Sequence, residues 1–122
     1  MFSDQTPIYR QIADQIRQDI LAERIQEEEK VMSTNQYASF YRINPATAQK
    51  AFQSLVDEGI LYKQRGIGMF VSTGARNQLL KEHRENFFKD VMLPMLEQAR
   101  AIGITDEELI DYITSNNGVE NS

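Results

Sequence analysis

The sequence predicts a mainly α-helical protein with one small β-hairpin, and three observations support this fold class. Residues 44–59 carry the start and stop signals of a helix, with apolar side chains on one face. Two short runs of strand-forming residues, 60–65 and 69–72, flank a Gly-x-Gly bend. Residues 75–102 repeat apolar side chains at alternating spacings of four and three, which is typical of a long helix that packs against another helix.

Composition limits the class of protein. The 122 residues are enough for one compact domain with a small appendage, and they include no cysteine. Disulfides and thiolate metal sites are therefore excluded, and the reducing cytoplasm is the expected location. No apolar run approaches the roughly 20 residues that span a bilayer, and the polar N-terminus lacks a signal-peptide pattern, so we expect no membrane partner.

The charge is unevenly distributed along the chain. The net charge of −5 argues, taken alone, against nucleic acid as a partner. Residues 30–71, however, hold five Lys or Arg against two Asp or Glu, which gives +3. Residues 73–122 hold five basic against nine acidic residues. Because the local field decides whether phosphate binds, the middle of the chain remains a candidate for nucleic-acid binding.

Two helices are predicted before the central one. Thr6 as N-cap and Pro7 in the first turn open a helix whose isoleucines repeat every four residues as far as about Ala22. An acidic loop follows over 23–30, then a short extended piece. Ser33 offers a cap for a short second helix that continues through Phe40.

The sequence of the central helix contains residues that favour both its start and its end. Asn44 is a good N-cap, Pro45 fits the first helical position, and Gly59 supplies the left-handed residue that ends a helix. Its polar face carries Ala46, Thr47, Gln49, Lys50 and Gln53. Such a face suits the floor of a DNA major groove. The same pattern also fits an ordinary amphipathic helix with a solvated side.

The hairpin follows the central helix directly. Gly66 and Gly68 allow a tight bend, and Arg65 lies near its tip. Two helices joined by a turn, followed by a basic hairpin, form a winged helix-turn-helix. A wing can place arginine or backbone amides along a phosphate strand or in a minor groove.

The C-terminal part is predicted as a helical tail. A long helix runs from about Ala75 to Ile102, and Pro94 should kink it or remove a hydrogen bond. Thr105 begins a capping box that opens a last helix. Because one helix and a short partner cannot bury two apolar lines, we expect a second copy to cover them. The residues of this expected dimer interface are Leu80, Phe87, Phe88, Val91, Met92, Met95, Leu96 and Ala99. The alternative is a last helix that folds back over them.

The expected organisation is a winged helix-turn-helix DNA-binding domain over 1–73, a short two-helix dimerisation tail over 74–114, and a disordered C-terminus over 115–122. Motifs along 7–72 support the first domain, whereas the tail is identified only by its length and pattern. These motifs are Pro7-x-Tyr9-x-Gln11-Ile12, Ser33 and Ala38, Asn44-Pro45-x-Thr47-x-Gln49-Lys50-Ala51-Phe52, Leu55, Glu58-Gly59 and Arg65-Gly66-x-Gly68-x-Phe70-Val71. In this order they resemble the GntR-type bacterial regulators, and the small tail resembles their YtrA-like subfamily.

The resemblance implies a homodimeric transcription regulator, usually a repressor, bound to a palindromic double-stranded DNA operator. Three departures stand out. Asn35 lies where the family has an arginine that binds phosphate or guanine, Glu27–Glu29 replace a loop that usually bears glycine, and Arg42 lies where glycine is frequent. Asn35 brings no charge, so the resemblance implies weaker affinity or an atypical operator, which Arg42 would partly offset.

Roles follow from residue chemistry. Thr47, Gln49 and Lys50 are the predicted contacts of the central helix, since a Gln amide can pair with adenine N6 and N7 and a Lys can reach guanine or phosphate. Arg42 suits a phosphate, although solvated surface charge is the plain alternative for it and for Lys63. Asn44 is better explained as a cap than as a base reader. The resemblance adds positions that match the family's DNA contacts, and the full set of predicted DNA-binding residues is Ser33, Asn35, Arg42, Asn44, Pro45, Ala46, Thr47, Gln49, Lys50, Arg65, Gly66 and Gly68.

No catalytic set is present in the sequence. His83 is the only histidine and has no cysteine or second histidine beside it, so we expect no enzyme, no metal and no cofactor. A small-molecule effector stays open, because a small pocket between the tail helices is possible. The alternative function is a winged-helix protein-interaction module, which Asn35 and the acidic loop favour.

Overall fold

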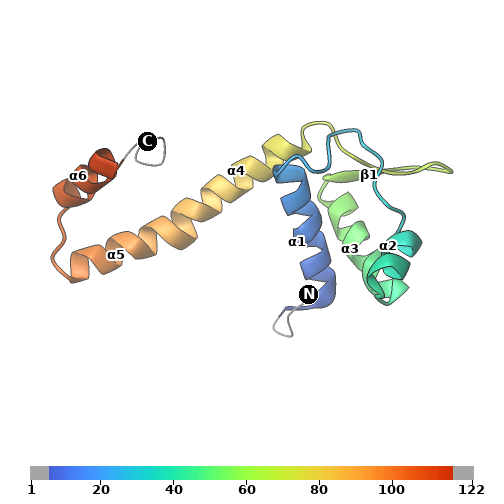
Figure 1. Ribbon diagram of the computed structural model, residues 1–122, viewed down its shortest axis with the longest axis horizontal. Helices are drawn as coiled ribbons and strands as arrows, with labels where there is room; N and C mark the ends of the chain where they lie inside the picture. Colours follow the sequence, from blue (N-terminus) through green and yellow to red (C-terminus); the bar gives the residue numbers. More distant parts are fainter. Residues whose placement is uncertain (1–5, 117–122) are drawn as a thin grey trace. The chain divides into compact units, whose positions relative to one another are not determined.

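The computed structural model describes residues 6–116 and divides the chain into two compact units, one ending at Lys81 and the other beginning at Glu82 (Figure 1). The first unit contains α1 (Ile8–Leu21), α2 (Thr34–Tyr41), α3 (Pro45–Asp57), β1 (Leu61–Gln64), β2 (Gly68–Val71) and the beginning of α4 (Ala75–Phe87). The second unit contains the rest of α4, the π-helical turn η1 (Phe88–Met92), α5 (Leu93–Ala101) and α6 (Asp106–Asn116).

The winged helix-turn-helix predicted from the sequence is confirmed. β1 and β2 pair antiparallel, with Leu61 opposite Val71 and Gln64 opposite Gly68. The expected extended piece after the acidic loop is also present, because Lys30 forms a bridge with Phe70. The two helices α2 and α3 precede this hairpin, and both pack on the core that they share with α1.

The core of the first unit is closed. The isoleucine stripe of α1 is buried after its first member, since Ile12, Ile16 and Ile20 are at most 4% exposed while Ile8 is 44% exposed. The apolar face of α3 and the beginning of α4 complete this core, with Phe52 and Leu79 at 1% and 0% exposure. The first unit therefore extends past residue 73, since the first turns of α4 belong to its core.

The beginning of α1 differs from the expectation. Pro7, not Thr6, occupies the N-cap position, and no side-chain cap hydrogen bond forms there. The Thr6 carbonyl accepts a hydrogen bond from Gln11 Nε2 at 2.6 Å instead. The assignment of Thr6 as the N-cap is therefore wrong. The side chain that hydrogen-bonds at this end of the helix is that of Gln11, which lies one turn inside α1.

The caps of α2 and α3 form as predicted. Ser33 Oγ accepts from the Gln36 backbone N–H, and Gln36 Oε1 accepts from the Ser33 N–H, which completes a capping box. Asn44 Oδ1 accepts from the Ala46 N–H at 2.8 Å. Gly59, just past α3, has a φ of +80°. Arg42 lies between the helices at a φ of +55°, a left-handed conformation that glycine adopts at less cost than arginine.

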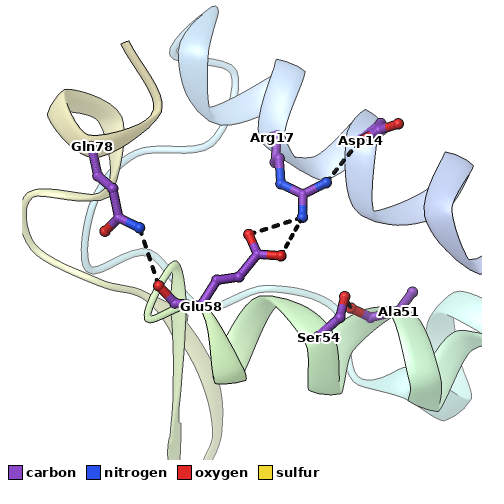
Figure 2. A network of polar contacts seen from close by, with 6 residues as sticks. All are labelled: Asp14, Arg17, Ala51, Ser54, Glu58 and Gln78. Carbon is purple, nitrogen blue, oxygen red and sulfur yellow. Dashed lines mark hydrogen bonds and ion pairs between the residues drawn. The ribbon is translucent and has the colours of Figure 1, made fainter. Parts of the chain in front are cut away.

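A polar network joins α1 to the end of α3 and to α4 (Figure 2). Arg17 donates to both carboxylate oxygens of Glu58, at 2.9 and 2.7 Å, and to Asp14 at 2.6 Å. Gln78 Nε2 donates to the Glu58 carbonyl at 3.1 Å. Partial burial acts to lower the pKa of Arg17, but hydrogen bonds and charge from Glu58 and Asp14 outweigh it and raise the pKa. The guanidinium is thereby fixed as a charged link between the elements.

A second set of contacts holds the acidic loop to the hairpin and to α4. Glu28 accepts hydrogen bonds from Thr73 Oγ1 and from the Tyr62 hydroxyl. These bonds lower the pKa of Glu28, since they favour its charged form. Glu27 accepts from the Arg76 backbone N–H at 3.2 Å, at the beginning of α4. The acidic residues that replace the family's loop therefore have a structural role.

The tail helix contains the disturbance expected at Pro94, in the form of a π-helical turn. η1 ends at Met92, two residues before Pro94, which lies in the first turn of α5. A wider turn accommodates a residue that has no N–H and that crowds the preceding turn. Thr105 and Glu108 form the predicted capping box before α6.

The end of the last helix differs from the expected boundary. α6 includes Ser115 and Asn116, two residues that we expected in a disordered terminus. Thr114 Oγ1 donates to the Ile110 carbonyl and Asn116 Nδ2 donates to the Tyr112 carbonyl, so side chains satisfy carbonyls of the last turns. The rest of that expected terminus, 117–122, lies outside the described residues, as do residues 1–5 of the expected first domain.

Candidate nucleic-acid interface

The two faces of α3 have opposite environments. Ala48, Ala51, Phe52 and Leu55 are at most 1% exposed and face the core. The opposite face is open to solvent at the predicted contact positions Pro45, Ala46, Gln49 and Lys50, and Thr47 is half-buried. The structure thus presents one continuous polar side of this helix, and its beginning carries no acidic residue.

Gln49 is connected to α2. Thr34 Oγ1 donates a hydrogen bond to Gln49 Oε1 at 3.3 Å. The two helices are locked beneath this contact, because the Tyr37 ring meets the Phe52 ring edge to face at a centroid distance of 5.4 Å. Gln49 is therefore not an independent surface side chain, and its amide has a fixed neighbour.

Lys50 is connected to α1. Its ammonium lies 4.2 Å from the centroid of the Tyr9 ring, within the range of a cation–π interaction. The adjoining Arg10 lowers the pKa of Tyr9, first through a hydrogen bond and then through its charge. Tyr9, Lys50 and Ala46 also line two shallow hollows beside α3. The beginning of α1 is thus part of the same surface as the polar face of α3.

The remaining predicted contacts surround this face. Ser33 and Asn35 are exposed at the beginning of α2, and Ser33 Oγ already serves as a cap acceptor. Asn44 is exposed, but its Oδ1 caps α3. Arg42 is exposed in the turn between α2 and α3. The structure brings these residues to the α2–α3 side of the first unit, and their contact with DNA stays a prediction.

The charged side chains of the wing are exposed to solvent. Lys63 and Arg65 are exposed, and Gly66 has a φ of +77° in the bend that follows. Gly68 has a φ of +148°, a conformation that residues with a side chain rarely adopt, and an added Cβ there would also displace the flexible end of Lys30. The predicted roles of Gly66 and Gly68 are therefore consistent with a bend that a side chain would disturb.

Sequence reasoning missed Thr34 and underused Tyr9. Thr34 is separated from Gln49 by 15 residues, and Tyr9 from Lys50 by 41. Residues this far apart are not neighbours within one helix or strand. Whether they meet depends on the angle at which the helices pack, which the sequence pattern does not give. The one available signal was that Tyr9 lies beside the apolar stripe of α1, where it can reach a neighbouring element.

The predicted dimer interface residues lie on α4, η1 and α5, and half of the eight are open to solvent in the single chain. Phe87, Phe88 and Val91 are each 52% exposed and Met95 is 40% exposed. Leu80, Met92 and Leu96 are partly buried, and Ala99 is buried within its own chain at 6% exposure. In the described part of the second unit, Ala99 is the one buried apolar residue.

Residues 6–116 contain neither a cluster of metal-ligating side chains nor a helix that could span a membrane. No group of three or more His, Cys, Asp or Glu side chains there is placed to hold a metal ion. Over the same residues, each helix is too short or too polar to cross a bilayer.

Comparisons with known proteins agree with this architecture. Residues 8–71 match the bacterial regulatory proteins of the gntR family. The chain is 31% identical over 108 residues to the HTH-type transcriptional repressor YtrA of Bacillus subtilis, covering 88% of this chain and 82% of that protein. A crystal structure of a GntR-family transcriptional regulator from Bacteroides thetaiotaomicron is similar with a TM-score of 0.76 and 30% identity, covering 94% of this chain and 99% of that one.

The similar structures include three complexes of AraR with an operator. One of them is the AraR DNA-binding domain in complex with operator ORR3, with a TM-score of 0.53 and 29% identity. The similarity covers 59% of this chain and 88% of that chain.

Proposed function

Because this chain belongs to the GntR family of bacterial regulatory proteins, it is a DNA-binding transcription regulator, and we propose that it represses transcription as a homodimer on a palindromic operator. The 31% identity to YtrA supports a place in the YtrA-like subfamily. A regulator that acts on bacterial DNA works in the cytoplasm, which agrees with a chain that has no cysteine.

The exposed polar side of α3 carries this proposal. It is the face that a helix-turn-helix places in the major groove, with the N-terminal residues of the helix against the base edges. The cap at Asn44 and the buried opposite face hold the helix rigidly, so Thr47 and Gln49 are presented without a large ordering cost. The AraR domain in its operator complex shows that a similar fold binds DNA.

The positive side chains around α3 have a different role. Lys50 is held over the Tyr9 ring, toward the beginning of α1, and this position suits a phosphate better than a base edge. Arg42, Lys63 and Arg65 are exposed and suit the flanking phosphates. This arrangement supports a proposal in which Thr47 and Gln49 read bases while the cations neutralise phosphates.

The second unit supplies the dimer. Phe87, Phe88, Val91 and Met95 leave a large apolar surface open on α4, η1 and α5. Exposed apolar area of this kind marks an interface, and each of these side chains gains roughly 1.5–3 kcal/mol when it is fully buried. A second copy is self-complementary under a two-fold axis, and two copies of α3 then read an inverted repeat.

A salt series tests DNA binding against the alternative of a protein-interaction module. The full chain is titrated with a labelled operator duplex, and log K is measured against log salt concentration. DNA binding predicts a steep negative slope of about −0.9 for each phosphate neutralised. Lys50→Ala should weaken binding to operator and random duplex alike, whereas Gln49→Ala should weaken the operator more. The absence of a salt slope would support the interaction module instead.

A further inference from the structure

The hydrogen bond between Thr34 and Gln49 bears on which base Gln49 recognises. Thr34 Oγ1 donates and Gln49 Oε1 accepts, at 3.3 Å. A threonine hydroxyl has one proton to give, and a glutamine amide has an acceptor end and a donor end. The contact therefore uses one of the two lone pairs of Gln49 Oε1 and leaves both amide N–H groups at the other end of the amide.

Thr34 is well placed to hold this orientation. It is the first residue of α2, directly after the N-cap Ser33 and inside the capping box that Ser33 forms with Gln36. α2 is fixed against α3 by the Tyr37–Phe52 ring contact and by the hydrogen bond from the Ile43 N–H to the Ala38 carbonyl. Threonine is also β-branched, so its χ1 angle has few alternatives. The hydroxyl thus has a defined position relative to Gln49.

The bases differ in what they offer such an amide. Adenine presents an acceptor, N7, beside a donor amine at N6, and a bidentate pair with glutamine needs the amide oxygen as an acceptor. Guanine presents two acceptors, N7 and O6. With Thr34 on one lone pair of Oε1, the adenine amine would have to approach along the one lone pair that remains, whereas guanine would meet the two N–H donors of Nε2.

We propose that Thr34 is a positioning residue that turns Gln49 into a donor, so that Gln49 selects guanine over adenine in each half-site. This inference rests on the proposed function, since it assumes that the polar side of α3 enters the major groove. It differs from the usual pairing of glutamine with adenine, which the sequence alone suggests. The groove strengthens the effect, because a hydrogen bond gains strength where water is excluded.

The test uses the full chain and a set of duplexes that carry each of the four base pairs at every position of a selected half-site. Gln49→Ala first identifies the position that Gln49 reads, as the one where discrimination disappears. Thr34→Val then removes the hydroxyl and keeps the branched shape, and Thr34→Ser keeps the hydroxyl. The readout is the ratio of affinities for guanine and adenine at that position, together with the affinity for random duplex.

The wild-type chain should prefer guanine by about three- to tenfold, the worth of one neutral hydrogen bond. Thr34→Ser should keep this preference, and Thr34→Val should reduce it to less than about twofold with affinity for random duplex unchanged. If the wild type prefers adenine, or if Thr34→Val keeps the wild-type ratio of affinities for guanine and adenine, the proposed role of Thr34 is wrong. Gln49 would still stand as the base reader in that case. If Gln49→Ala flattens no position, both this inference and the proposed reader fail.

Discussion

The two units of this chain use their apolar residues in opposite ways. In the first unit, large side chains such as Ile12, Phe52 and Leu79 are at most 1% exposed. In the described part of the second unit, Phe88, Ile102 and Ile113 are 52%, 75% and 62% exposed. The first unit encloses a core of its own, with exposed apolar side chains such as Phe40 and Ile67 outside it, whereas the second unit has helices whose apolar side chains are mostly exposed.

This difference matches a division of labour. A rigid first unit can present a reading surface with little entropy lost on binding. An open second unit can associate with its copy and thereby bring two reading surfaces onto one DNA. The predictions below test each side of this contrast.

The largest effect is expected where the open surface is made polar. Phe88→Asp places a charge in the proposed dimer interface, so the chain should become monomeric by analytical ultracentrifugation. Operator affinity should fall by about 10²–10⁴-fold, because the second half-site is no longer bound intramolecularly. Lys89→Asp is the matched control, since it adds an acidic residue on the same turn at a position that is already polar. Phe88→Asp that stayed dimeric would contradict the proposed interface.

Contacts between residues close in the sequence could be predicted better than contacts between distant residues. The caps at Ser33, Asn44 and Thr105 could be predicted because each depends on residues within three positions. The pairs Arg17–Glu58 and Thr34–Gln49 could not, since they depend on the crossing of helices. Apolar spacing located the tail surface without showing what covers it.

The next effect is expected in the closed core. Phe52→Ala removes a ring that is 1% exposed and in contact with Tyr37, so unfolding free energy should fall by about 3–5 kcal/mol. Chemical denaturation followed by circular dichroism measures this at a fixed protein concentration, because dimerisation shifts apparent stability. A loss below about 1 kcal/mol would mean that the first unit is not self-sufficient.

A smaller effect concerns acid stability at the base of the hairpin. The folded pKa of Glu28 lies below its ordinary value of 4.5, so its contribution is complete above that pH. The contribution is lost as pH falls through the lowered folded pKa. Thermal unfolding from neutral to acid pH should therefore show the wild type losing its advantage over Glu28→Gln, with Tyr62→Phe intermediate. Parallel curves for all three would exclude this link.

The smallest effect separates stability from binding at Arg42. Because Arg42 has a φ of +55°, Arg42→Gly should raise the unfolding free energy by about 0.5–1 kcal/mol. The same substitution should weaken DNA binding on all sequences, since it removes a cation from the α2–α3 turn. Denaturation and a duplex titration on one preparation measure both. If Arg42→Gly raised both the unfolding free energy and the affinity for DNA, a phosphate contact by Arg42 would be contradicted.

The central claim is that two copies of α3 enter successive major grooves on one side of a duplex. Selection of bound DNA from a random pool, with the full chain at moderate salt, tests it most directly. The account predicts an inverted repeat whose half-site centres lie about 10–10.5 base pairs apart. Recovery of a single half-site, or of no common sequence, would contradict it.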